Sequence, residues 1–300
     1  MAKIAATHLA SGDGWSVEDV ICSAGPQDRP YEEQHEHVAI AIVTGGSFQY
    51  RGSGAGPGRE LMTPGSLLLG NPGQCFVCGH EHAHGDRCLS FRFSPEYFAA
   101  ITRGVRRGRR DRFGMLRLPP VRELSPVIAR AVALRLAPGE AGGLAQGRLA
   151  AFAWEELGVR LAIEAVQVDS GRTPSRAPVS AAALARVTRA VRLIDEQPAG
   201  ELTLGSLAKE AGLSPYHFLR TFEDLTGATP HQYVMRARLR QAAARLLSEP
   251  AKILDVALDS GFGDVSNFNR AFRGEFGASP RAYRRGHEIT KNTKTKQRVS

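Results

Sequence analysis

One stretch of this chain occurs twice, about fifty residues apart. The two copies share five residue types in the same order and spacing, namely Arg220, Phe222, Gly227, Pro230 and Tyr233 in the first copy and Arg270, Phe272, Gly277, Pro280 and Tyr283 in the second. Upstream of these sets, Ala208–Gly212 and Ala257–Gly261 repeat with an offset of 49, so the second copy has one more residue in its turn. Such a repeat predicts one small helical unit that is built twice.

The first copy carries the signals of two short helices joined by a turn. Thr203 can cap a helix over Leu204–Ala211, and Gly212 suits a sharp turn. Ser214 followed by Pro215 is typical of the start of the next helix. In that helix Phe218, Phe222 and Leu225 lie on one face, which we expect to be buried.

The second copy repeats this helix-turn-helix pattern. A helix over Ile253–Ser260 is followed by Gly261, and Asp264 is the expected cap of a helix whose buried stripe is Phe268, Phe272 and Phe276. Between the copies, Pro230–Glu249 predicts one long helix with four arginines, Arg236, Arg238, Arg240 and Arg245. A rigid connecting helix would fix the separation of the two units, ideally near one DNA turn of about 34 Å.

The outer faces of the two second helices are polar. The first presents Tyr216, Leu219, Arg220 and Glu223, and the second presents Ser266, Asn269, Arg270 and Arg273. Arg can bond two acceptors of guanine and Asn can do so with adenine, and a major groove admits a helix. The alternative is a plain helical domain with a solvated arginine face.

The charge distribution favours the first of these interpretations. The whole chain has a formal charge of +9, and residues 184–300 hold 19 Lys and Arg against 12 Asp and Glu. Residues 1–183 hold the remaining 20 basic and 18 acidic residues. The basic excess therefore lies with the repeated units, as expected where a protein meets phosphates. Residues 287–300 are basic without apolar periodicity and are expected to be a disordered tail.

Residues 207–284 resemble the DNA-binding domain of the AraC/XylS family of bacterial regulators. The resemblance rests on Gly261-Phe262 and on the closing pattern Phe272-x4-Gly277-x2-Pro280-x2-Tyr283. It implies a transcriptional regulator, and the expected DNA-binding residues are Ser214, Tyr216, Leu219, Arg220, Val265, Ser266, Asn267, Asn269 and Arg270. Leu219 and Val265 are apolar, and contact with thymine methyl groups is the role open to them.

The N-terminal half has a different pattern. Between residues 17 and 98, short apolar runs such as Val38–Val43 and Leu89–Phe93 alternate with Gly and Pro turns, which predicts a small barrel or sandwich. Helical spacing follows over about 120–168, a linker is expected at 169–181, and a helical domain over 182–286, with its two units at about 204–226 and 253–276. The predicted fold class is a mainly β domain with following helices, joined to an all-α double helix-turn-helix domain.

The same resemblance implies that the N-terminal domain, residues 1–168, is a cupin-like barrel that senses an effector. His35 and His37 resemble the cupin metal motif. Ala41 and Ile42 stand where that motif would continue with an acidic ligand, so an iron-cupin active site is not expected. A metal-dependent cupin enzyme fused to a DNA-binding domain is the alternative to a non-enzymatic regulator.

A second cluster of ligand-type residues follows at Cys75-x2-Cys78-x-His80-x-His82-x-His84, with Cys88 four residues later. Cys and His are ligands that Zn²⁺ prefers, so bound zinc is one interpretation. Thiol chemistry with oxidants or electrophiles is another, and an incidental cluster is the third. The tentative sensor set is His35, His37, Cys75, Cys78, His80, His82 and Cys88.

The expected partners are double-stranded DNA, a small effector and a second copy of the chain, paired through the helix over 145–166 as the resemblance implies. RNA polymerase is a further candidate, and activation or repression is left open. No run approaches the roughly 18 apolar residues of a membrane span. The first 16 residues lack the apolar core of a signal peptide. We therefore expect a cytoplasmic protein with reduced cysteines.

Overall fold

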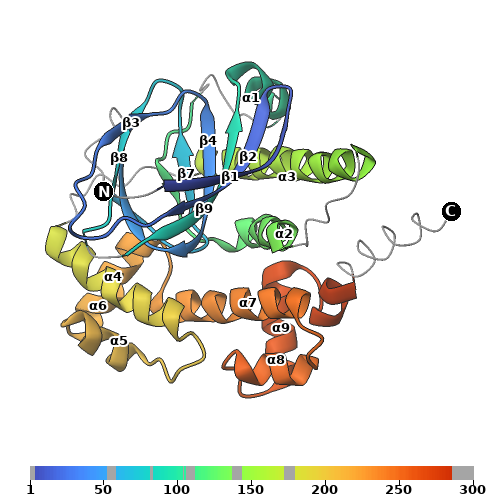
Figure 1. Ribbon diagram of the computed structural model, residues 1–300. Helices are drawn as coiled ribbons and strands as arrows, with labels where there is room; N and C mark the ends of the chain where they lie inside the picture. Colours follow the sequence, from blue (N-terminus) through green and yellow to red (C-terminus); the bar gives the residue numbers. More distant parts are fainter. Residues whose placement is uncertain are drawn as a thin grey trace.

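The computed structural model describes residues 4–52, 59–81, 84–103, 105, 112–136, 144–171 and 180–285. Figure 1 shows a β-rich N-terminal half stacked on a helical C-terminal half, with α2 and α7 lying along the boundary. The expected basic tail at 287–300 lies outside the described residues, as does most of the expected linker at 169–181. Among the helices that are described, none is long and apolar enough to cross a membrane.

The N-terminal half contains two antiparallel sheets. The larger sheet has the strand order β1 (Ile4–Gly12), β2 (Trp15–Cys22), β9 (Asp86–Phe93), β4 (Val38–Gly46), β7 (Leu67–Gly70) and β10 (Arg117–Leu118). The smaller sheet has the order β3 (Glu32–Gln34), β8 (Cys75–Gly79), β5 (Phe48–Gly52) and β6 (Arg59–Met62). Within the described strands neither sheet closes on itself, because β1 and β10 remain the edges of the larger sheet. The structure therefore corrects the expected closed barrel to two open sheets.

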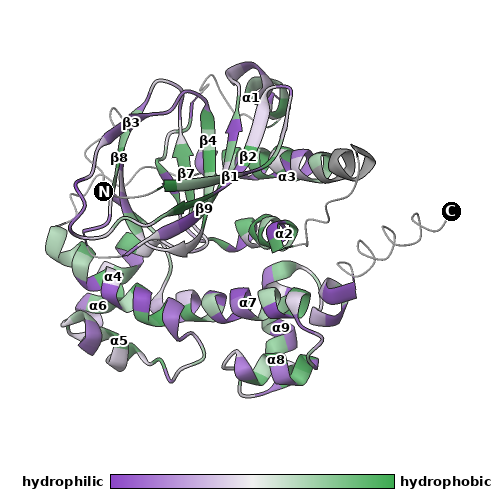
Figure 2. Ribbon diagram, viewed as in Figure 1, coloured by the Kyte–Doolittle hydropathy of each residue, from purple (hydrophilic) through white to green (hydrophobic). Residues whose placement is uncertain are grey.

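The larger sheet is buried on both faces. On one face Ala41, Val43 and Leu68 pack with Phe48 and Tyr50 of the smaller sheet. On the other face Ile40, Leu69 and Phe91 belong to a core cluster with Trp154 and Leu161 of α3. This double burial explains why β4 is an unbroken apolar run rather than an alternating one, and Figure 2 shows β4 and β7 as predominantly hydrophobic.

Three helices cover the outer face of the larger sheet. They are α1 (Pro95–Thr102), α2 (Ser125–Leu136, preceded by a 3-10 turn at Arg122–Leu124) and α3 (Leu144–Ser170). On α3, Trp154, Leu157, Leu161 and Ala165 are buried at helical spacing. The helices thus complete the N-terminal core and leave α2 facing the C-terminal half (Figure 1).

The C-terminal half contains α4 (Ala181–Glu196), α5 (Leu204–Ala211), α6 (Pro215–Thr226), α7 (Pro230–Ser248), α8 (Ile253–Asp259) and α9 (Val265–Phe276), and residues 280–285 are also helical. The caps expected at Thr203, Ser214 and Asp264 are confirmed, since each side chain accepts a backbone N–H of its helix. Gly212 has a φ of 62° and Gly277 a φ of 71°, a left-handed conformation that other residues adopt at a cost.

The two helix-turn-helix units have separate cores that share one helix. The first core packs α4, α5 and α6 around Tyr233, Val234 and Ala237 from the first part of α7. The second packs α8 and α9 around Leu239 and Leu246 from the last part of the same helix. The predicted stripes of phenylalanine are fully buried or nearly so in both units. Because α7 belongs to both cores, the orientation of one unit relative to the other is set by this helix.

Arg238 ties the two units together from the middle of α7. Its Nε and Nη2 atoms donate to the carbonyl oxygens of Pro198 at 2.8 Å and Gly200 at 2.9 Å, in the loop before α5. Its Nη1 atom donates to the carbonyl oxygen of Gly261 at 2.8 Å, in the turn before α9. Gly261 has a φ of 85°, and a Cβ atom there would lie 2.9 Å from Arg238 Nε. The close approach therefore requires glycine.

We expect Arg238→Met to lower the free energy of unfolding by about 1.5–3 kcal/mol, because three carbonyl groups lose a charged donor. The measurement is urea unfolding followed by circular dichroism. Arg189→Met, at an exposed position of α4, is the matched control and should stay within about 0.5 kcal/mol of the wild type. Equal stability of the two variants would contradict a structural role for Arg238.

Candidate nucleic-acid interface

The second helix of the first unit, α6, presents its predicted outer face to solvent. Tyr216 is 63% exposed, whereas Phe218 and Phe222 on the opposite face are fully buried. Arg220 is exposed, and its Nη1 atom lies 3.4 Å from the hydroxyl oxygen of Tyr216, one turn earlier. Leu219 is half-buried, and the Ser214 oxygen caps the helix by accepting the N–H of His217. The face is therefore accessible, with an arginine held beside an aromatic ring.

The second helix of the second unit, α9, has the same organisation. Ser266, Asn267, Asn269 and Arg270 are exposed, and Val265 is half-buried. Arg270 Nη2 donates to Asn267 Oδ1 at 3.3 Å, again between residues one turn apart. Each of the two helices thus carries an exposed arginine that a neighbouring polar side chain restrains. Sequence reasoning found these residues but not the two restraining contacts.

The two exposed faces are separated by the length of the shared helix. Figure 1 shows α6 near one end of α7 and α9 near the other. A helix of 19 residues is about 28 Å long, which is of the order of one turn of a DNA duplex. The four arginines of α7 are half-buried and interact within the protein. Arg238 bonds backbone carbonyls, Arg236 pairs with Glu275, Arg240 pairs with Asp195, and Arg245 pairs with Glu249 and Asp259.

The N-terminal half contacts both units. Buried Arg117 of β10 donates through Nη2 to the carbonyl oxygen of Thr226 at 2.5 Å, at the C-terminal end of α6. A cation is stabilised at that end of a helix because the last carbonyl groups carry partial negative charge. Arg236 of α7 donates to the carbonyl oxygen of Pro120 at 2.6 Å. Ser125 of α2 donates to Glu275 of α9. Contacts from the N-terminal half therefore reach the second helix of each unit.

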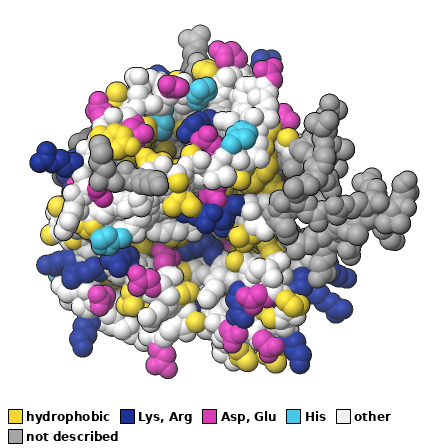
Figure 3. Space-filling model, in the orientation of Figure 1, with side chains coloured by type: hydrophobic (Ala, Val, Ile, Leu, Met, Phe, Trp, Pro, Cys, Tyr) yellow, Lys and Arg dark blue, Asp and Glu magenta, His cyan; other side chains and the backbone are white. Residues whose placement is uncertain are grey.

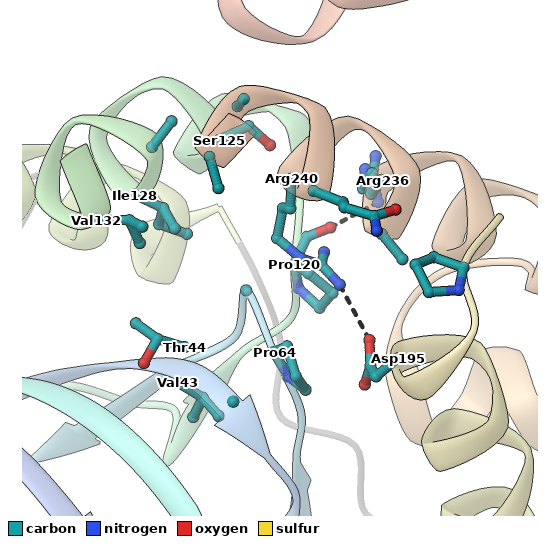
Figure 4. A pocket seen from close by; sticks show the side chains of 18 of the residues that line it. Val43, Thr44, Pro64, Pro120, Ser125, Ile128, Val132, Asp195, Arg236 and Arg240 are labelled. Atoms are coloured by element: carbon teal, nitrogen blue, oxygen red, sulfur yellow. Dashed lines mark hydrogen bonds and ion pairs between the residues drawn. The ribbon is translucent and has the colours of Figure 1, made fainter. Parts of the chain in front are cut away.

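A cavity of about 840 Å³ lies between the two halves. Figure 4 shows Val43, Thr44 and Pro64 from the sheet domain on one side, with Asp195 and Arg240 on the other. Its lining is mainly apolar, and it also includes Arg135, Arg192 and Arg236. Figure 3 shows basic side chains in the hollow between the halves. The size suits a small organic molecule, since ligand pockets usually measure about 300–1,000 Å³.

Charge at the cavity wall is balanced within the protein. Burial raises the pKa of Asp195 to about 6, although Arg240 and the Tyr233 hydroxyl act in the opposite direction. Arg240 Nη2 lies 3.4 Å from Asp195 Oδ1, and the Tyr233 hydroxyl donates to Asp195 Oδ2 at 3.1 Å. The cavity thus borders residues of the first core. A molecule bound in it would contact α4 and α7, the helices against which α6 packs.

Among the described residues of the tentative sensor set, no three bring their ligand atoms together in a group that could hold a metal ion. His35 is stacked on Phe76, with ring centroids 4.1 Å apart, and its Nε2 atom lies 2.8 Å from the Tyr50 hydroxyl. Burial lowers the pKa of His35 to about 4. His37 is exposed and Cys75 half-buried, and His82 lies outside the described residues.

The remaining members of the set are buried to different extents. Burial raises the pKa of the Cys78 thiol well above its usual range, and the Cys88 thiol is fully enclosed with its pKa raised in the same way. A protonated, enclosed thiol is a poor nucleophile. His80 is buried, and its Nε2 atom lies 2.6 Å from Asp86 Oδ2.

One group of metal-ligand type side chains does come together among the described residues. It consists of Cys22, His80 and Asp86, whose ligand atoms all lie within 4.8 Å of one another. The sequence indicated His80 alone, because Cys22 and Asp86 belong to no ligand-spacing motif. The pairing of β2 with β9, which sets Cys22 opposite Asp86, is the feature that brings them together.

Comparison with known proteins places the similarity in the C-terminal half. Residues 207–286 match a family described as "Helix-turn-helix domain". The chain is 38% identical over 87 residues to "Transcriptional regulator Rob" of Salmonella typhimurium, covering 29% of this chain and 30% of Rob. It is 34% identical over 94 residues to "Regulatory protein SoxS" of the same organism, covering 31% of this chain and 88% of SoxS.

A third relative gives a similar alignment. The chain is 35% identical over 83 residues to "Probable transcription factor PqrA" of Proteus vulgaris, covering 28% of this chain and 68% of that protein. The chain spans about 30% of the length of Rob and of the other first curated relatives that it matches. The similarity therefore concerns a part of Rob, whereas it extends over most of SoxS and PqrA.

The contact of Arg117 with α6 gives a direct test of how the halves are joined. Arg117→Met removes the charged donor to the Thr226 carbonyl, so amide hydrogen exchange over residues 219–227 should become faster. Exchange in the larger sheet should stay the same, as measured by mass spectrometry. Arg92→Met, which removes an exposed arginine paired with Glu18, is the control. Unchanged exchange in α6 would show that the contact does not hold this helix.

Proposed function

Because this chain belongs to the AraC/XylS family of DNA-binding transcriptional regulators, we propose that it reads a specific DNA site with α6 and α9. The observation that carries the proposal is the pair of exposed faces on two capped helices joined through one rigid helix. The base-reading set is Ser214, Tyr216, Leu219, Arg220, Val265, Ser266, Asn267, Asn269 and Arg270. Arg220 and Arg270 suit guanine, and Asn269 suits adenine.

The physical basis of this reading is preorganisation. A flexible arginine loses rotamer freedom when it binds a base, and that loss weakens binding. Contacts with Tyr216 and Asn267 restrain Arg220 and Arg270 before DNA arrives. The Arg238 bonds act in the same way on a larger scale, because they limit how far the two units can rotate about α7. Both effects favour a single spacing of the two half-sites.

We expect Arg220→Ala and Arg270→Ala each to weaken binding to a duplex selected by the wild-type protein from a random pool. The expected loss is roughly five- to a hundredfold for each, because a bidentate contact with a base is removed. Binding to an unrelated duplex should change much less. The measurement is fluorescence anisotropy at fixed salt, since affinity depends strongly on ionic strength.

Arg92→Ala is the control for the loss of one positive charge, because Arg92 is an exposed arginine of the sheet domain. It should bind the selected duplex like the wild type. A wild-type protein that binds every duplex alike would contradict sequence reading. So would wild-type affinity in both the Arg220 and the Arg270 variant.

The N-terminal half is proposed to be the regulatory part, which receives an effector and alters DNA affinity. Supporting this, its contacts end on Thr226 of α6 and on Glu275 of α9. The cavity between the halves borders the same region and is a suitable place for a small effector. Pairing of two copies through α3 belongs to the same proposal, where Phe152 is 65% exposed. An effector acts only if it binds two arrangements of the halves with different affinity.

The coupling can be tested without knowing the effector. If the N-terminal contacts hold α6 in its reading orientation, Arg117→Met should weaken binding to the selected duplex by about fivefold or more, the lower end of usual coupling between sites. The reading faces are untouched in this variant. Anisotropy with Arg92→Met as the control provides the measurement. Wild-type affinity in Arg117→Met would mean that the N-terminal half does not influence reading through this contact.

A further inference from the structure

Three side chains from separate parts of the N-terminal sequence meet at one end of the two sheets. Cys22 is the last residue of β2, Asp86 is the first residue of β9, and His80 follows β8 of the smaller sheet. Their ligand atoms lie within 4.8 Å of one another. We propose that Cys22, His80 and Asp86 form a binding site for a zinc-class divalent metal ion. The proposal goes beyond DNA reading and does not depend on it.

Backbone pairing fixes the positions of the three residues. Cys22 and Asp86 are direct neighbours in the register of β2 and β9, so their side chains leave the same face of the sheet. His80 approaches from the other sheet, and its ring is stacked on Phe48, with centroids 5.8 Å apart. Cys22 and Asp86 are held at paired strand ends, and His80 lies directly after β8, so the strands fix much of the spacing that a metal site requires.

The surroundings of the three ligand atoms suit an ion. The Asp86 carboxyl is 8% exposed and the His80 side chain 4% exposed. The Ala24 N–H donates to Cys22 Sγ at 3.4 Å, and the Cys88 thiol donates to Asp86 Oδ1 at 3.5 Å. Such contacts orient ligands and stabilise charge on sulfur and carboxylate. Burying a carboxylate is costly unless a positive charge accompanies it; the His80 imidazole lies 2.6 Å from Asp86 Oδ2, and a bound ion would supply that charge in its place.

The distances allow the ion to enter with small movements. Bonds to zinc measure about 2.3 Å for sulfur and about 2.0–2.2 Å for nitrogen and oxygen. Ligand atoms around a tetrahedral ion are then about 3.3–3.8 Å apart. The His80 and Asp86 atoms, now 2.6 Å apart, must separate slightly, and atoms toward the 4.8 Å limit of the group must approach. Rotations about side-chain bonds are sufficient for both changes.

The donor set defines the chemical class of the ion. One thiolate, one imidazole and one carboxylate match zinc and its close relatives such as cobalt, whereas calcium and magnesium prefer oxygen ligands alone. Three protein ligands leave a fourth position for water or a small molecule. The proposed metal site also lies close to the cavity between the two halves. Gly46, which pairs with Asp86, lines the cavity between the halves together with His84.

Close packing of the backbone supports a built site. A Cβ atom on Gly46 would lie 2.2 Å from the Gly85 carbonyl oxygen and 2.8 Å from Asp86 Cα. The Gly85 N–H donates to the carbonyl oxygen of Ala24 at 2.8 Å, two residues after Cys22. The end of β4 and the segment after β2 therefore both press against Asp86, and the ligands cannot drift apart without breaking these contacts.

The test uses the full chain without an affinity tag, stripped with a chelator and titrated with Co²⁺ and then with Zn²⁺ in competition. We expect one ion per chain, a near-ultraviolet thiolate-to-cobalt absorption band, and displacement of cobalt by zinc. Cys22→Ser should abolish that band and weaken zinc binding at least tenfold, and Asp86→Asn should weaken zinc binding at least tenfold. Loss of an outer contact alone commonly costs tenfold or more. Circular dichroism of each variant reports folding, and Asp86→Asn keeps the shape of the side chain.

Cys75→Ser is the matched control, because Cys75 is also a half-buried cysteine of the same domain but is not one of the three ligands. It should bind zinc and cobalt like the wild type. The proposal is overturned if the wild-type chain takes up no ion, or if Cys22→Ser binds as tightly as the wild type. It is equally overturned if Cys75→Ser loses the cobalt band, since the ligands would then be different residues.

Discussion

The arrangement of the C-terminal half depends on one arginine in the middle of one helix. Arg238 donates to carbonyl groups on both sides of α7, in the loop before α5 and in the turn before α9. Without it, the two small cores would lose a side chain that bonds to both, and each would be less restrained against rotation about the helix axis. A protein that reads two neighbouring stretches of groove requires a fixed distance and a fixed angle between its reading helices. The length of α7 sets the distance between α6 and α9, and the hydrogen bonds of the Arg238 guanidinium restrain the angle between them.

The same helix also connects reading to the N-terminal half. Arg236, two residues before Arg238, donates to the Pro120 carbonyl and pairs with Glu275 of α9, which in turn accepts from Ser125. Arg117 contacts the C-terminal end of α6. The N-terminal half therefore contacts the framework that orients α6 and α9, while the side chains proposed to face bases are left exposed. Under the proposed function, a signal that shifts these contacts would change the geometry of DNA reading without blocking the proposed DNA-binding surface.

Local signals in the sequence were sufficient to predict most of the helices and turns of the C-terminal half. A cap such as Asp264, a turn glycine such as Gly212 and a stripe of phenylalanines act within one or two helical turns, so the residues themselves predict them. The N-terminal half depends on strand pairing, which a single sequence does not reveal. β1 begins at Ile4, whereas the sequence predicted strands only from about residue 17. The side chains of β1 are mostly exposed and lack a clear alternation, so no signal in the sequence indicated this strand. For the same reason the sequence did not indicate Cys22, which meets Asp86 only through the register of β2 and β9.

The energies involved explain how a small ligand could control such a protein. Coupling between two sites usually amounts to about 1–3 kcal/mol. One hydrogen bond to a charged group is worth about 1.5–3 kcal/mol. The change of a single contact at the boundary, such as that between Arg117 and Thr226, is thus large enough to alter DNA affinity measurably. Both the cavity and the Cys22, His80 and Asp86 group lie beside this boundary, the latter through Gly46. Under the proposed function, a ligand at either place would act by shifting one of these boundary contacts, because such a contact is of the same energy as the usual coupling.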